Sequence, residues 1–373
     1  MSLMRSTVSN GSIALEELFE RGRNSFSILR LLLAAAVIVS HSFYLPGYGM
    51  DPLEQWSGLR LGEVAVDGFF ALSGMLVATS LQGNRDLGRF IRHRLVRLMP
   101  GFWVCLLFCA FVLSPITVVI DLGWSGLFKT STFASLFGYV IKNSALVVVE
   151  PTLPNVLSGL SYQRINPSLW SLAPEACCYV LLALACALRL LDGKGRSFIL
   201  LFVFFIGLMS LSGIAVHFLL AVGGAPAIRL IELGLHFLSG VLVVLFLKRL
   251  RLSGMVTICL MVAYAVCLAY QPLQFLRILF LAPMLAVLAR VIPLHGVCDT
   301  MDISFGLYLY GSALQQVMVW LGFTGLGPWS FFTMSFLATA PIAALSWMLI
   351  EKPALRQWSK RRVNQLTVTP GHA

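Results

Sequence analysis

The chain has 373 residues, of which 58% are hydrophobic and only 12% are charged. Soluble domains carry about 25% charged residues, and a soluble core could not hide this much apolar surface, whereas a bilayer requires it. The composition therefore excludes an ordinary soluble protein. The formal net charge is +11, but no zinc-finger spacing, RNA-binding signature or soluble basic domain accompanies it, so we expect no nucleic-acid partner.

Apolar segments of about 20 residues predict an all-α, polytopic membrane bundle with ten transmembrane helices. In chain order these are 27–45, 61–81, 99–120, 169–191, 197–218, 228–247, 253–270, 272–292, 302–322 and 328–350. The segment 132–149 contains Lys142 and Asn143, and we expect it to lie in or near the membrane interface.

The distribution of Lys and Arg gives the predicted bundle a direction. With the N-terminus inside, the inner segments carry 18 of these residues and the outer segments carry 4. This bias predicts cytoplasmic N- and C-termini in a bacterial inner membrane. The chain then divides into a cytoplasmic segment, 1–26, a transmembrane domain, 27–350, and a basic cytoplasmic tail, 351–373.

The eight cysteines do not show the spacing of a metal site with supporting histidines. Most of them lie in apolar runs, where cysteine behaves as a small buried residue. We therefore expect no metal.

Two polar residues stand on one face of the first predicted span. Arg30 lies near its inner end, and His41 follows eleven residues later, which is about three turns and ~16 Å along a helix. A cation near the cytoplasm and a titratable base in the outer half thus share one helix face.

Further polar side chains are expected in the outer half of the membrane. Charged residues there are costly and usually face the protein interior or a water-filled cavity. We interpret the layer as a functional site, with a purely structural polar network as the alternative. Its members are His41, Asp67, Glu175, Glu232, Arg277 and Gln315.

The segment 82–98 contains five arginines and is predicted to be an inner loop. Contact with anionic lipid explains such a segment. Multidentate phosphate binding is the alternative, because the guanidinium fork matches phosphate oxygens.

Several segments together resemble the acyltransferase-3 family of membrane-bound acyltransferases, over about residues 25–353. The family pattern begins with Arg30 and, after ten residues, His41. The remaining segments are VDGFFALSGML at 66–76, RLVRLMP at 94–100, NPSLWSLAPE at 166–175 and ISFGLYLY at 303–310. Gly311 stands where many relatives have histidine, which indicates a subgroup.

This resemblance implies an O-acyltransferase that moves an acyl group, in most cases acetyl, from cytoplasmic acyl-coenzyme A to a hydroxyl of an envelope or secreted carbohydrate. It makes His41 the general base, with Glu175 or Asp67 orienting it. It also implies that Arg30, Arg94 and Arg97 hold the coenzyme A donor. We expect Trp170, Arg277 and Gln315 to contribute to substrate binding.

Two other functions fit a bundle with buried charges. A transporter or flippase for a lipid-linked saccharide is one, although no inverted repeat is evident. A membrane scaffold is the other. The sequence leaves open the identity of the acceptor and whether the chain is a monomer or a homo-oligomer.

Overall fold

The computed structural model describes residues 25–83, 86–190, 202, 224–246, 254–292, 294 and 301–358. These residues form helices and connecting segments without a strand, as the composition predicts. The α-helices are α1 Phe26–Tyr44, α2 Pro52–Ser57, α3 Leu61–Gly83, α4 Leu87–Phe108, α5 Ser114–Leu127, α6 Thr130–Asn143, α7 Leu172–Ala187, α10 Gly224–Phe246, α11 Gly254–Ala269, α12 Arg277–Val291, α13 Ser304–Trp320 and α14 Pro328–Ser346. Short 3₁₀ helices cover Pro167–Ser171, Gln271–Leu276 and Phe323–Leu326, and π-helical turns cover Cys109–Leu113 and Trp347–Glu351.

Within this described part of the chain, 7 helical segments are long and apolar enough to cross a membrane. They are Phe26–Tyr44, Leu61–Leu81, Leu87–Leu127, Pro167–Ala187, Ala227–Phe246, Gln271–Val291 and Pro328–Trp358. Each matches one of the ten predicted spans. The predicted span 197–218 lies outside the described residues apart from Phe202, and the predicted span 253–270 is a shorter apolar helix, Met255–Ala269.

The basic segment that was predicted to be a loop is helical from Leu87 onward, which corrects the boundary at residue 99. The Asp86 side chain accepts a hydrogen bond from the Arg89 backbone at the start of α4. The helix then continues through the π-helical turn into α5, which is kinked at Gly123 (φ 70°) and ends at Leu127. The predicted helix start was placed after the charged residues, because hydropathy marks only apolar residues. Arginine is nevertheless a good helix former, so the helix begins before the apolar run.

Helix α13, which matches the predicted span 302–322, has 17 residues and is enclosed by the rest of the bundle. Thirteen of its side chains are buried, including Tyr308, Tyr310, Gln315 and Gln316. It packs against α1, α14 and the 3₁₀ turn before α7. Because its neighbours are protein rather than lipid, this helix can carry polar side chains that a lipid-facing helix could not.

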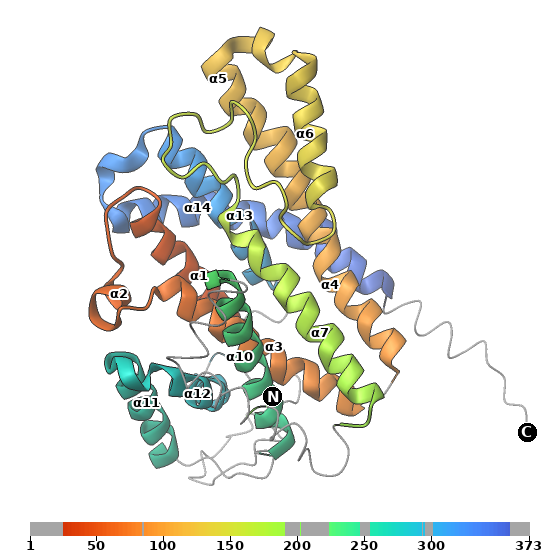
Figure 1. Cartoon of the computed structure of the whole chain (residues 1–373), viewed down its shortest axis with the longest axis vertical. Helices are drawn as coiled ribbons and strands as arrows, with labels where there is room; N and C mark the ends of the chain where they lie inside the picture. The colour runs from red at the N-terminus through yellow and green to blue at the C-terminus, as the bar shows by residue number, and fades with distance from the viewer. Residues whose placement is uncertain are drawn as a thin grey trace, which may run out of the picture.

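Helices α3 and α10 cross in close contact near the centre of the molecule (Figure 1). A Cβ atom on Gly74 would lie 2.0 Å from the Phe237 carbonyl oxygen, and one on Gly240 would lie 2.1 Å from that of Ala71. Only glycine allows the two backbones to approach so closely, as is common in membrane helix pairs.

Helices α5 and α6 pack against each other at one end of the molecule (Figure 1). Helix α6 has 14 residues, fewer than the ~20 needed to cross a bilayer. It covers most of the segment 132–149, for which an interfacial position was predicted.

Candidate active site

A pocket opens between α1, α3, α4, α7 and α13, with about 740 Å³ of empty space that includes the solvent at its open mouth. Its walls combine apolar rings with a dense group of ionisable and hydroxyl side chains. The polar lining consists of Arg30, Ser73, Arg94, Arg97, Ser171, Glu175, Tyr179 and Tyr308. The three arginines that the sequence assigned to the donor thus converge on one cavity, together with the predicted catalytic residue Glu175.

One carboxylate holds two of these arginines. Arg30 Nη1 lies 2.8 Å and Arg97 Nη2 lies 2.7 Å from the same oxygen, Oδ2 of Asp302. The Ser304 hydroxyl donates to the other oxygen, Oδ1, at 2.5 Å. Asp302 directly precedes α13, so it ties α1 and α4 to the start of the central helix.

Arg97 also approaches a second acid, Glu351, at the end of the π-helical turn that follows α14. Its Nη1 lies 3.6 Å from Glu351 Oε2, and the Ser346 hydroxyl donates to Glu351 Oε1 at 3.1 Å. Glu351 is 2% exposed. The Arg97 guanidinium is therefore compensated from two sides, by residues from two other helices.

Arg94 is different, because it forms no ion pair within the described part of the chain. Its guanidinium carbon lies 5.7 Å from the Phe90 ring centroid and 5.8 Å from that of Tyr179. Its Nε is buried without a hydrogen-bond partner among the described residues. Aromatic faces stabilise a cation but do not neutralise it.

Glu175 lies one turn into α7 and faces the pocket. Its Oε1 accepts hydrogen bonds from Ser73 Oγ, at 3.0 Å, and from the Tyr179 hydroxyl. Beside it, the hydroxyls of Ser171 and Tyr308 lie 2.5 Å apart. The motifs around 66–76, 166–175 and 303–310 therefore meet at one wall of the cavity.

His41 lies in the last turn of α1 and does not line this pocket. Its Nδ1 is buried and has no hydrogen-bond partner among the described residues. Neither Glu175 nor Asp67 therefore orients the imidazole in this structure. By helix periodicity His41 stands on the same face of α1 as Arg30, about three turns further along.

Two tyrosines and two arginines form a chain of contacts that begins one turn from His41. Tyr44 follows one turn later on α1, and the Arg60 guanidinium carbon lies 4.6 Å from its ring centroid. The Tyr162 ring contacts Tyr44 edge-on at 5.6 Å, and Arg164 lies over Tyr162 at 5.8 Å. Burial raises the pKa of the Tyr162 hydroxyl, so it stays protonated at neutral pH.

Two buried side chains fix the end of α1. Asp51 begins α2 by accepting from the backbones of Leu53 and Glu54, and its Oδ2 also accepts from the Ser40 hydroxyl at 2.7 Å. Gln315 Nε2 donates to the Ile38 carbonyl at 3.0 Å and to Ser42 Oγ at 2.9 Å. Gln315, predicted to bind substrate, is therefore engaged in holding the helix that carries His41.

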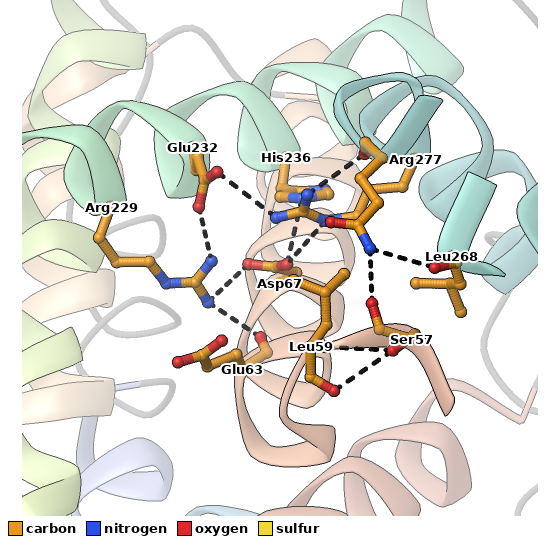
Figure 2. A network of polar contacts seen from close by, with 10 residues as sticks. Ser57, Leu59, Glu63, Asp67, Arg229, Glu232, His236, Leu268 and Arg277 are labelled. Atoms are coloured by element: carbon orange, nitrogen blue, oxygen red, sulfur yellow. Dashed lines mark hydrogen bonds and ion pairs between the residues drawn. The ribbon is translucent and has the colours of Figure 1, made fainter. Parts of the chain in front are cut away.

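Asp67 belongs to a separate buried network between α3, α10 and α12, shown in Figure 2. Its carboxylate lies 2.8 Å from Arg229 Nη2, 3.3 Å from His236 Nε2 and 3.6 Å from Arg277 Nε. Glu232 pairs with both arginines, at 3.0 and 3.5 Å. The two acids and two arginines balance, so the network is neutral when His236 is neutral.

The predicted polar layer is thus distributed over different places. Asp67, Glu232 and Arg277 share the network in Figure 2, whereas Glu175 faces the arginine pocket. Trp170, predicted to contact substrate, is 39% exposed and does not line the pocket. Arg277 is 6% exposed and engaged by acids.

Sequence reasoning missed Asp302, Glu351 and Arg229. The signal for Asp302 and Glu351 was present, since both are acids at helix ends where the predicted inner surface is rich in arginine and lysine. Arg229 was placed within a span but not paired with Asp67. Which helix ends meet depends on the packing of the bundle, and that information is not local in sequence.

Comparisons with known proteins identify the family of the chain. A family model described as an acyltransferase domain matches residues 23–351. The chain is 25% identical to an O-acetyl transferase of Shigella phage Sf6 over 91% of this chain and 98% of that protein. It is 26% identical to Nodulation protein 10 of Rhizobium leguminosarum bv. viciae over 93% of this chain and 97% of that protein.

No solved structure matches the chain significantly. The family match spans the pocket, the His41 helix and the buried network, and therefore nearly the whole described bundle. The chain belongs to the acyltransferase-3 family and is a membrane O-acyltransferase.

Proposed function

We propose that the protein transfers an acyl group, in the simplest case acetyl, from acyl-coenzyme A to a hydroxyl of an envelope or secreted carbohydrate. The observation that carries the proposal is the convergence of Arg30, Arg94 and Arg97 on one cavity. Arginine is well suited to phosphate, and the donor has several phosphates. One of the relatives is named O-acetyl transferase.

The donor enters from the cytoplasm in this proposal. The pocket arginines belong to the ends of α1 and α4 that the positive-charge bias assigns to the inner side of a bacterial inner membrane. The pantetheine arm then extends along α1 toward His41, ~16 Å from Arg30 at helical rise.

His41 is the proposed general base. It accepts the proton of the acceptor hydroxyl while the hydroxyl oxygen attacks the thioester carbonyl. The carbon–sulfur bond breaks as the tetrahedral intermediate collapses, and His41 returns the proton to the leaving thiolate. The products are an ester on the carbohydrate and free coenzyme A.

The acceptor side of the proposal is the group around His41, namely Tyr44, Arg60, Tyr162 and Arg164. Tyrosine rings pack well against the C–H faces of sugars and keep a polar edge for hydroxyl groups. The reacting hydroxyl must come within hydrogen-bond reach of the base, and Tyr44 lies one turn from His41.

The experiment supplies radiolabelled acetyl-coenzyme A and candidate glycans to the purified full chain. We expect His41→Ala to lose ~10²-fold or more of the transfer rate, the usual contribution of a general base. The matched control is Leu32→Ala on the same helix, at a side chain that is 54% exposed. A His41→Ala protein that folds and transfers at the wild-type rate contradicts the mechanism.

Mass spectrometry of carbohydrates from wild-type and deletion cells identifies the acceptor. We expect the deletion to lack one ester per modified repeating unit, and complementation to restore it. Unchanged carbohydrates, together with no donor-dependent release of coenzyme A in vitro, would overturn the proposed function. Movement of a lipid-linked saccharide without such release would then favour a transporter.

A further inference from the structure

The three arginines of the pocket stand in two different electrostatic situations. Arg30 and Arg97 share one carboxylate oxygen of Asp302, at 2.8 and 2.7 Å. Arg97 has Glu351 in addition, at 3.6 Å. These two cations are therefore already compensated by acids of the chain itself.

Arg94 has no acid within ion-pair distance in the part of the chain that the structure describes, and the Glu175 carboxylate of the same pocket attracts its charge only from further away. Its neighbours at the guanidinium are the Phe90 and Tyr179 rings, and its Nε is buried without a hydrogen-bond partner. Leaving a buried donor unpaired is unfavourable. An anion in the pocket would gain both a charge partner and a prepared donor group at this side chain.

We propose that Asp302 is a built-in counter-ion, which withdraws Arg30 and Arg97 from anion binding and leaves Arg94 to bind one phosphate of the acyl donor. The inference rests on the proposed function and narrows it. A pocket in which one cation stands outside any ion pair selects one anionic group. The recognised part of the donor is then phosphopantetheine, which coenzyme A and acyl carrier protein share, rather than the nucleotide.

Asp302 is in this view a positioning residue. It fixes the Arg30 guanidinium at the start of α1 and the Arg97 guanidinium on α4, and it is itself held by Ser304. Two fixed cations shape the pocket around the pantetheine arm without competing for the phosphate. Removing the acid adds unpaired positive charge to the pocket and frees both side chains to move.

The first test measures binding of phosphopantetheine and of pantetheine to the full chain in lipid nanodiscs. We expect the wild type to bind the phosphorylated compound about tenfold tighter or better, a difference of ~1.4 kcal/mol. Arg94→Gln should remove this preference. Arg92→Gln is the matched control, because Arg92 is exposed on the same helix.

The second test is a kinetic comparison at Asp302. We expect Asp302→Asn to lower kcat about tenfold without raising the KM for acetyl-coenzyme A, and Asp302→Glu to recover part of kcat. A purely structural role would lower the amount of folded protein without this split. Acetyl-coenzyme A and acetylated acyl carrier protein, compared as donors, identify the source of the phosphopantetheine.

The outcomes separate the two proposals. The inference is overturned, and the proposed function stands, if the wild type transfers acetyl groups but the Arg94→Gln variant keeps the preference for phosphopantetheine. The same holds if the Arg97→Gln variant loses that preference instead. A wild type that binds phosphopantetheine through Arg94 but transfers no acyl group supports the Arg94 site and refutes the proposed function. Equal binding of both compounds by the wild type overturns the inference.

Discussion

Arg97 Nη2 and Asp302 Oδ2 lie 2.7 Å apart although 205 positions separate the two residues in sequence. The contact joins α4 to the start of α13, and the same oxygen receives Arg30 from α1. One carboxylate therefore fixes the relative positions of the three helices that carry most of the charged pocket wall.

Glu351 should matter less than Asp302 for the same guanidinium. Its oxygen lies 3.6 Å from Arg97, beyond hydrogen-bond distance, and an amide could still accept from Ser346. We expect Glu351→Gln to change kcat by less than about threefold, or under ~0.7 kcal/mol. Steady-state kinetics with acetyl-coenzyme A measures kcat for both variants. A larger decrease of kcat in Glu351→Gln than in Asp302→Asn would contradict the prediction.

The Asp67 network should contribute to stability. Removing one partner of a buried ion pair costs about 3–5 kcal/mol, because the other charges stay buried and uncompensated. We expect Asp67→Asn to lower the melting temperature strongly. The matched comparison is Glu150→Gln, which breaks the ion pair between Glu150, 39% exposed, and Lys142, 57% exposed. Exposed pairs contribute about 0–1 kcal/mol.

Thermal unfolding in detergent, followed by fluorescence, measures both changes. Transfer activity per folded molecule is the second readout. If Asp67→Asn melts like the wild type but transfers no acyl group, the residue acts in the reaction, and the stabilising role assigned here is wrong.

The close crossing of α3 and α10 should not tolerate a methyl group. We expect Gly74→Ala to reduce the yield of folded protein sharply, because the new Cβ would lie 2.0 Å from a backbone oxygen that cannot move aside alone. Gly138→Ala in α6 is the control, since nothing lies within 4 Å of its Cβ position, and alanine in a helix gains up to ~1 kcal/mol.

Size-exclusion chromatography of the two variants, expressed side by side, decides this prediction. Equal yields of monodisperse protein from Gly74→Ala and Gly138→Ala would show that the two helices can separate without loss of the fold.

Much of the pocket was predictable because its residues follow local patterns. The Arg30 and His41 spacing indicates one helix face, and the segment 94–100 places two arginines one turn apart. The structure brings Arg30, Arg94 and Arg97, which the family resemblance assigned to the donor, to one cavity, together with Glu175, which was expected in the outer-half layer. The spacings within one helix follow from helix periodicity, whereas the meeting of α1, α4 and α7 in one cavity depends on how the bundle packs.

The grouping of the polar layer was not predictable in the same way. The predicted depth in the membrane is the same for Asp67 and Glu175, but Asp67 lies in the ion-pair network with Arg229 and Glu175 lies in the arginine pocket. Depth follows from counting residues along one helix. Lateral position depends on which helices pack together, and here that is set by Gly74 and Gly240 against opposing backbones.

Helix α1 fixes the position of His41 relative to Arg30. Arg30 and His41 belong to a single uninterrupted helix, so the distance between donor pocket and base is set by peptide geometry and not by a loop. One inserted residue between them would lengthen the helix by only ~1.5 Å but turn His41 by about 100° away from its face. In the proposed mechanism the angular position of His41 is therefore restricted more strictly than its distance from the pocket, and the acyl donor reaches His41 only in the register that this helix defines.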